Sequence, residues 1–193
     1  MSETSIQIQP YEAVTVLRLC SDDGTNRLTY ACIASLTDAL CGLRDGGTGL
    51  IITGNNKFFS AGAELKEIAA LTAVTAYEFA RRGQRLMETV ANFPVPVYAA
   101  ISGFCVGGGL DLALACHRRI AASHAVFGHR GAALGLITGW GGTQRLPRLI
   151  GKGQALAMFV AADKIDASHA LRLGLIDAIA EDPVAEASRR IPK

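Results

Sequence analysis

Two short segments of this sequence could hold backbone N–H groups around a single oxygen atom. The segment SAGAE covers Ser60–Glu64 and the segment VGGGLD covers Val106–Asp111, and each follows an apolar run and leads into a predicted helix. Glycine and alanine leave the backbone N–H groups uncovered, and the start of a helix adds a partial positive charge. Such groups can bind an anion or the oxygen of a polarised carbonyl. The alternative is that both segments are ordinary strand-to-helix turns.

One acidic residue, Asp111, follows the three glycines directly. It stands among Leu110, Leu112 and Leu114, and apolar surroundings raise the pKa of a carboxyl group. A raised pKa suits general acid–base catalysis near neutral pH. The alternative is structural, because an acid in the first turn of a helix is favoured by the helix dipole.

Several other kinds of site are excluded by the absence of their motifs. The sequence has no GxGxxG or GxxxxGK[ST] phosphate loop, no GxSxG nucleophile elbow, and no HExxH or CxxC metal pattern. No metal site is therefore predicted. The five cysteines form an odd set in mostly apolar runs, which predicts buried free thiols.

The elements that must hold these segments alternate between strands and helices. Strands are predicted at Ala13–Leu19, Thr48–Gly54 and Val97–Ile101, in AVFGH and, briefly, in IAAS and before residue 181. Helices are predicted at Leu28–Asp45, about Thr75–Val90, in GGLDLALACHRRI, within 140–162, in KIDASHALRLGLIDAIA up to Gly174, and at the end of the chain. The segment NNKFFSAGAELKEIAAL is predicted as a loop. This alternation favours an α/β fold.

Size and charge narrow the function classes further. The 193 residues are expected to form one domain, 1–193, with its core at about 10–180 and a short helix at 183–193. The net charge of +2 gives no nucleic-acid or membrane-surface signature, and the apolar runs are too short to span a bilayer. The polar start MSETSIQIQP is unlike a signal peptide, so the cytoplasm is the expected location.

Three segments together resemble the crotonase superfamily, the enoyl-CoA hydratase/isomerase family. They are IITGNNKFFSAGAELKEI, PVPVYAAISGFCVGGGLDLALACHRRIAASHAVFG and LGLITGWGGTQRLPRLIGKGQALAMFVAADKIDASHALRLGLIDAI, within a match from about Val14 to Ala180. The resemblance implies a spiral core of repeated ββα units and a homotrimer or dimer of trimers. It also implies an acyl-CoA thioester as substrate, as in fatty acid metabolism, and no other cofactor.

The resemblance also assigns roles to the residues of the site. The backbone N–H groups of Ala63 and Gly108 would form an oxyanion hole for the thioester carbonyl, and Asp111 takes the place of the first of two catalytic glutamates. The second glutamate is replaced by Gly131, which puts hydration in doubt. His129 beside it is a candidate base, and the alternative for His129 is a surface or turn position.

The further aspartate used by dienoyl-type isomerases would fall near Gly139, again a glycine.

Further residues are candidates for binding the substrate. Arg27, Lys57 and Lys66 could pair with CoA phosphates, and their alternative is a solvated surface charge. The remaining candidates lie beside the oxyanion residues or toward the acyl group: Ala61, Gly107 and Trp140.

Two functions follow and both stay open. The first is an enzyme that stabilises a thioester enolate, with Asp111 as acid–base, by isomerisation, decarboxylation, C–C bond hydrolysis or hydration. The second is a non-catalytic acyl-CoA-binding homologue. Members of the family usually continue with further helices, so the resemblance also implies a shortened C-terminal helical region, with a more open pocket or an altered trimer contact.

Overall fold

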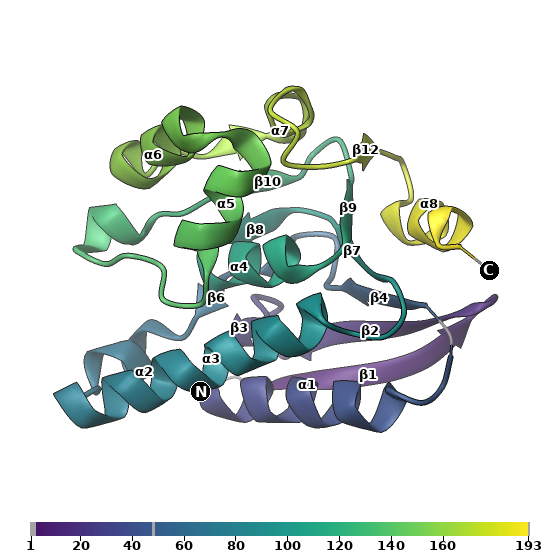
Figure 1. Ribbon diagram of the computed structural model, residues 1–193, viewed down its shortest axis with the longest axis horizontal. Coiled ribbons are helices and arrows are strands. Elements are labelled where there is room, and N and C mark those ends of the chain that lie inside the picture. Colours follow the sequence, from purple (N-terminus) through teal and green to yellow (C-terminus); the bar gives the residue numbers. More distant parts are fainter. Residues whose placement is uncertain (1–2, 48, 193) are drawn as a thin grey trace.

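Alternating strands and helices make up the computed structural model, which describes residues 3–47 and 49–192 (Figure 1). The strands are β1 (Thr4–Tyr11), β2 (Val14–Ser21), β3 (Arg27–Leu28), β4 (Leu50–Thr53), β5 (Phe58–Ser60), β6 (Gly62–Ala63), β7 (Val97–Ile101), β8 (Phe104–Val106), β9 (Arg118–Ala121), β10 (Val126–Gly128), β11 (Ile165–Asp166) and β12 (Ala178–Ile179). The helices are α1 (Tyr30–Leu43), α2 (Leu65–Ala69), α3 (Ala73–Ala91), α4 (Gly108–Ala115), α5 (Gly142–Ile150), α6 (Lys152–Ala161), α7 (Ala167–Arg172), α8 (Pro183–Arg190) and the 3-10 helix η1 (Gly131–Leu134). The predicted α/β class is confirmed.

The largest sheet has six strands in the order β1-β2-β4-β7-β9-β12. Strand β1 is antiparallel to β2, and the other neighbours are parallel. In β7, Val97, Ala99 and Ile101 face the main core, while Tyr98 and Ala100 face a second apolar cluster. Both faces of this strand are therefore buried, which explains why its sequence is a continuous apolar run.

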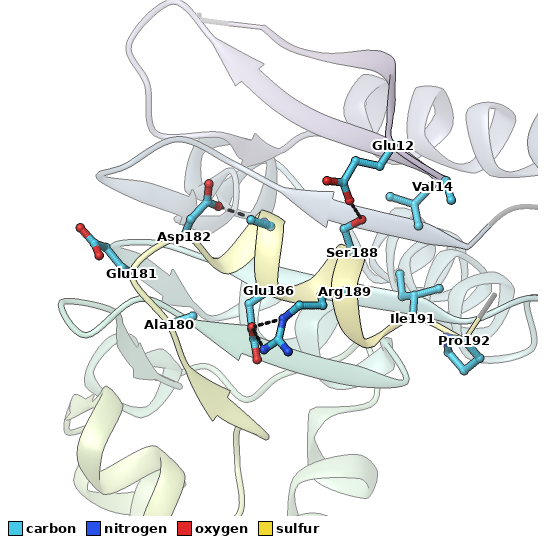
Figure 2. A pocket seen from close by; sticks show the side chains of 12 residues that line it. Glu12, Val14, Ala180, Glu181, Asp182, Glu186, Ser188, Arg189, Ile191 and Pro192 are labelled. Atoms are coloured by element: carbon cyan, nitrogen blue, oxygen red, sulfur yellow. Dashed lines mark hydrogen bonds and ion pairs between the residues drawn. The ribbon is translucent and has the colours of Figure 1, made fainter.

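The second apolar cluster is covered by α8. Ala187 of α8 and Ile191 after it pack on this face of the sheet, and Ser188 Oγ donates a hydrogen bond of 2.7 Å to Glu12 Oε2 in the β1–β2 turn (Figure 2). A cavity of about 680 Å³ lies between these elements, and its lining includes four carboxylates, Glu12 among them. The cavity contains none of the predicted site residues.

Two smaller sheets position the segments that the sequence analysis singled out. One has the order β11-β10-β8-β5, and the other pairs β3 with β6. Strand β8 leads directly into α4, and the end of β10 precedes His129. Helices α1 and α3 pack against each other (Figure 1).

Several predicted elements need correction. The predicted helix after the glycines ends at Ala115. Strand β9 begins at Arg118, two residues before the short strand predicted in IAAS, and ends at Ala121. The predicted loop contains β5, β6 and α2, and β1 was not expected from its polar sequence. The start of the predicted strand at Thr48 and the end of the predicted helix at Lys193 lie outside the described residues.

The five cysteines are free thiols as expected; Cys32, Cys105 and Cys116 are buried, but Cys20 is only half-buried and Cys41 is exposed. Across the described parts of the chain, no helix combines the length and apolar character that crossing a membrane demands.

Candidate active site

The two glycine-rich segments lie against each other in the fold. Gly62 has a φ of +87° and Gly107 a φ of +55°, and each glycine turns its segment sharply before the following helix. Glycine adopts such a conformation without steric cost. A Cβ atom placed on Gly108 would lie 3.3 Å from the backbone nitrogen of Ala63. The backbones of the two predicted oxyanion residues are therefore neighbours, although they come from distant parts of the sequence.

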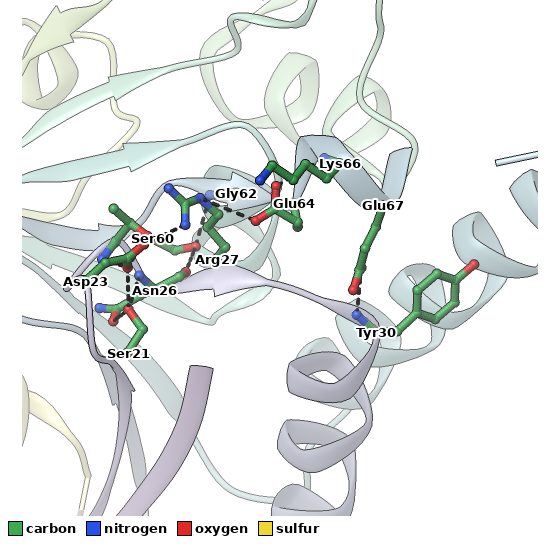
Figure 3. A network of polar contacts seen from close by, with 11 residues as sticks. Ser21, Asp23, Asn26, Arg27, Tyr30, Ser60, Gly62, Glu64, Lys66 and Glu67 are labelled. Carbon is green, nitrogen blue, oxygen red and sulfur yellow. Dashed lines mark hydrogen bonds and ion pairs between the residues drawn. The ribbon is translucent and has the colours of Figure 1, made fainter. Parts of the chain in front are cut away.

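A network around Asn26 fixes the first of these segments (Figure 3). The Asn26 side chain donates to the carbonyl oxygens of Phe58 and Phe59, at 3.0 and 3.3 Å. Ser60 Oγ donates to the Asn26 carbonyl at 2.6 Å and accepts from the Gly62 N–H at 3.1 Å. Asn26 has a φ of +51°, which asparagine tolerates better than most residues. The loop is thus held by buried hydrogen bonds, which limits its movement.

The three predicted phosphate-binding cations lie in different surroundings. The Arg27 guanidinium contacts Asp23 at 2.7 Å and Glu64 at 3.7 Å (Figure 3). Lys57 and Lys66 are exposed, and neither makes an ion pair with any residue that the structure describes. The two lysines therefore carry uncompensated positive charge, whereas that of Arg27 is balanced by carboxylates.

Most of the other candidate residues line one cavity of about 290 Å³. The candidates in its wall are Ala61, Ala63, Gly107, Gly108, Asp111, His129 and Trp140. The rest of the wall is mostly apolar and comes mainly from α2, α3, η1 and the loop that follows η1. Arg27, Lys57 and Lys66 do not belong to this wall. The cavity thus joins an apolar chamber to one acidic side chain.

Asp111 is almost completely buried, with 1% of its surface exposed. Burial raises the pKa of its carboxyl to about 7, although the Thr138 hydroxyl, the charge of Arg145 and the nearby backbone N–H groups of Trp140 and Gly142 act in the opposite direction. A charged carboxylate loses hydration when it is buried, which is the dominant cause here. Asp111 can therefore both accept and release a proton near neutral pH.

His129 lies beside Asp111 rather than on the surface. It is 4% exposed, and its Nε2 atom is 3.5 Å from Asp111 Oδ1. Its ring packs against Phe159, with ring centroids 5.2 Å apart. Burial lowers the pKa of His129 to about 4, so the imidazole is neutral at physiological pH. A surface position for His129 is therefore wrong, although the residue does lie in the short connection between β10 and η1.

Trp140 forms the inner wall of the cavity. Its ring packs against Phe79, with centroids 5.2 Å apart, and it lies over Gly108. A Cβ atom on Gly83 of α3 would overlap the indole ring. Trp140 is therefore held between two glycines and also faces the cavity.

Gly131 stands at the first position of η1, in a crowded backbone environment. A Cβ atom here would lie 2.7 Å from the carbonyl oxygen of Leu136, closer than real Cβ contacts come. By contrast, nothing lies within 4 Å of a Cβ atom placed on Gly139. A longer side chain therefore has space at Gly139 but not at Gly131.

Sequence reasoning missed two contributors to the site. Thr138 donates a hydrogen bond to Asp111 Oδ2, and Gly142 lies against both Asp111 and His129. Thr138 and Gly142 are in GLITGWGGTQ, where a polar residue among glycines before a helix was the available signal. In the part of the chain that the structure describes, no group of histidine, cysteine and acidic residues could hold a metal ion.

Comparison with known proteins gives one consistent family. The sequence profile of the enoyl-CoA hydratase/isomerase family matches residues 9–191. A probable enoyl-CoA hydratase of Bacillus subtilis (strain 168) is 40% identical over 185 residues, which is 94% of this chain and 70% of that protein. A crotonyl-CoA hydratase of Syntrophomonas wolfei is 38% identical over 184 residues, or 94% of this chain and 71% of that protein.

Solved structures agree with this result. The enoyl-CoA hydratase of Bacillus anthracis superposes with a TM-score of 0.88 at 35% identity, covering 96% of this chain and 73% of that one. An enoyl-CoA hydratase of Thermoplasma volcanium superposes with a TM-score of 0.91 at 31% identity, covering 95% and 74%. The sequence comparison and the structure comparison therefore identify the same kind of relatives.

Proposed function

The chain belongs to the enoyl-CoA hydratase/isomerase family of the crotonase superfamily, and we propose that it stabilises the enolate of an acyl-CoA thioester and moves a proton with Asp111. The observation that carries the proposal is a single buried carboxyl with a pKa of about 7, in the wall that also holds Ala63 and Gly108. The acyl-CoA is the substrate, and the reaction needs no other cofactor.

In this proposal the backbone N–H groups of Ala63 and Gly108 bind the thioester oxygen. Hydrogen bonds to that oxygen are strongest when it carries negative charge, so they lower the energy of the enolate. The neighbouring backbones of these two residues support such a shared oxygen site. Exposed Lys57 and Lys66 are proposed to pair with CoA phosphates, because their charges are uncompensated.

Asp111 is proposed to take a proton from the carbon beside the thioester and to return it at another carbon. For a 3-enoyl thioester this moves the double bond to position 2 without adding or losing atoms. Hydration needs a second group to hold the water, and Gly131 offers no side chain for it. Among the described residues that form the wall, the titratable side chains besides Asp111 are His129 and Arg130. We propose His129 as the second proton-transfer group. The pair of carboxylates that the resemblance assigns to hydration is incomplete, because a neutral imidazole lies beside Asp111 instead of a second carboxylate. Proton transfer between carbons is therefore favoured over hydration.

Enolate formation can be tested separately from the complete reaction. The purified protein is incubated in D₂O with butyryl-CoA, and deuterium at the carbon beside the thioester is measured by mass spectrometry. Parallel assays follow crotonyl-CoA and a 3-enoyl-CoA by their thioester absorbance. Exchange and isomerisation without hydration are expected. Bound acyl-CoA with no exchange and no turnover would instead favour a non-catalytic acyl-CoA-binding protein.

The proposed assembly is a homotrimer or a dimer of trimers, as the resemblance implies. Light scattering on the purified protein measures its mass directly. A mass near three or six times the 20.3 kDa of this chain is the expected result, and a monomer would contradict this part of the proposal.

A further inference from the structure

The two oxygens of Asp111 have different surroundings. Oδ2 accepts a hydrogen bond from the hydroxyl of Thr138, in the loop between η1 and α5. Oδ1 is buried and has no hydrogen-bond partner among the described residues, and it is the oxygen that lies 3.5 Å from His129 Nε2. An unpaired buried oxygen is costly, so this arrangement is expected only where the oxygen has another use.

The start of α5 closes the space around this carboxyl. A Cβ atom on Gly142 would overlap Asp111 Oδ1, and it would lie 2.8 Å from Thr138 Cγ2 and 3.0 Å from His129 Nε2. Three side chains from separate segments therefore meet at the backbone of Gly142. This close packing and the hydrogen bond together leave the carboxyl group little freedom to turn.

We propose that Thr138 is a positioning residue that holds Asp111 by Oδ2, so that Oδ1 is the oxygen that exchanges a proton with the acyl group. This inference rests on the proposed function. Oδ1 and His129 Nε2 are the two buried polar atoms here that keep an unused hydrogen-bonding capacity among the described residues. Thr138 itself lines the cavity, but its hydroxyl is directed to Asp111 and not to the reacting carbon.

Thr138 also influences the protonation of Asp111. A hydroxyl that donates to a carboxylate stabilises the charged form, and here it lowers the pKa of Asp111 against the effect of burial. The other ionisable groups around Asp111 are His129 after β10, Arg145 on α5 and Cys105 on β8. All of them remain when Thr138 is changed, so the effect of the hydroxyl can be isolated.

The test compares Thr138→Val, which keeps the shape but removes the hydroxyl, with Thr138→Ser, which keeps the hydroxyl. Thr143→Val on α5 is the matched control, because Thr143 lies outside the wall of this cavity. The Val variant is expected to lower kcat by about tenfold or more with a small change in KM, since hydrogen bonds to charged groups contribute at this level. Its pH–rate profile should also move to higher pH, because Asp111 without the Thr138 hydrogen bond loses its proton at a higher pH. The Ser variant should restore both properties.

A second measurement does not depend on turnover. The carboxyl groups of ¹³C-labelled aspartate are titrated by NMR, and the Asp111 signal is assigned by its loss in Asp111→Asn. Thr138→Val, or Thr138→Ala if the Val variant does not fold, should raise the pKa of Asp111. An unchanged titration would overturn the proposal, as would an unchanged pH profile in an active Val variant. A wild-type protein that shows no exchange and no turnover refutes the proposed function, and the titration then decides separately whether Thr138 controls Asp111.

Discussion

Nε2 of His129 lies 3.5 Å from Oδ1 of Asp111, and within the described part of the chain neither atom has a hydrogen-bond partner. Burial raises the pKa of Asp111 to about 7 and lowers that of His129 to about 4. Between these values both groups are neutral, and above pH 7 the pair carries one negative charge. One ionisation, that of Asp111, therefore controls the charge of the site around neutral pH.

The activity should depend on pH through this ionisation. Asp111 acts as a base only when it is deprotonated, so kcat/KM is expected to fall tenfold for each pH unit below about 7. His129 stays neutral throughout this range. The measurement is a pH–rate profile of exchange or isomerisation, with His129→Gln as a comparison that should keep the same acidic limb. An acidic limb near pH 4 would contradict this prediction.

Replacing Asp111 by asparagine should remove catalysis but not binding. The amide has nearly the same shape and cannot exchange a proton, so turnover should fall by about 10²–10⁴-fold. The Kd for a saturated acyl-CoA, measured by calorimetry, should stay near the wild-type value. Asp38→Asn on the exposed face of α1 is the control and should retain full activity. Equal turnover in wild type and Asp111→Asn would remove Asp111 from the mechanism.

The same substitution should stabilise the fold at high pH. The folded-state pKa of Asp111, about 7, exceeds the ordinary aspartate value of 3.8, so the native state holds the proton more tightly than the unfolded state. The stability that Asp111 contributes is then lost as the pH rises from about 4 to 7. Asp111→Asn avoids this loss and should be more stable by about 1 kcal/mol above pH 7.

Urea unfolding of wild type and Asp111→Asn at several pH values measures this difference. His129 has the opposite dependence, because its lowered pKa makes the native state more stable as the pH rises from about 4 to 6.5. His129 is present in both proteins, so the difference between them reports Asp111. A gap that widens as the pH falls would have the wrong sign.

Introducing a glutamate at position 131 should not give the protein hydratase activity. Its Cβ atom would lie 2.7 Å from the Leu136 carbonyl, and relieving such a contact costs about 1–3 kcal/mol. Gly131→Glu should therefore melt at a lower temperature and hydrate crotonyl-CoA no faster than wild type. Gly139→Glu introduces the same side chain where a Cβ atom has space, and it should melt close to wild type. Full stability with strong hydration in Gly131→Glu would show that the loop adapts.

The single tryptophan should report occupation of the cavity. Trp140 is the one tryptophan of the sequence and lines the cavity that holds Asp111, so an acyl group bound there should change the emission of Trp140 by altering its surroundings. A saturable change is expected with a saturated acyl-CoA, and a smaller one with CoA alone. Trp140→Phe supplies the baseline. Calorimetric binding of the acyl-CoA with no change in emission would place the acyl group elsewhere.

The central part of the fold was predictable because its signals are local. Strand β7 is a continuous apolar run between prolines and glycine, and its predicted bounds, Val97–Ile101, match the structure. Strand β1 was missed because seven of its eight residues are only partly buried or exposed, and its alternation is carried by just two isoleucines, Ile6 and Ile8. The predicted short strand in IAAS covers the end of β9, but Arg118 and Arg119 at its start were assigned to the preceding helix. In the fold Arg119 is buried and bound to Asp177, a distant residue that the local sequence cannot reveal.

The site likewise has residues that local sequence signals predicted and residues whose surroundings depend on distant contacts. Ala63, Gly108 and Asp111 stand in segments whose composition already indicates exposed backbone and an acid in apolar surroundings, and they line one cavity. The burial of His129 and the hydrogen bond from Thr138 depend on how α5 packs against α4 and how Phe159 of α6 packs against the His129 ring. No pattern within one segment encodes these contacts.

Trp140 lies between Gly83 and Gly108, and this arrangement constrains the order in which the site can evolve. A side chain at position 83 overlaps the indole ring, so it is tolerated only after position 140 has become smaller. In the reverse direction, a tryptophan can be gained at position 140 only in a background that already has glycine at position 83. The two positions are therefore epistatic, because neighbours that share one volume do not change independently. A mutational path that takes them in the wrong order passes through a destabilised intermediate.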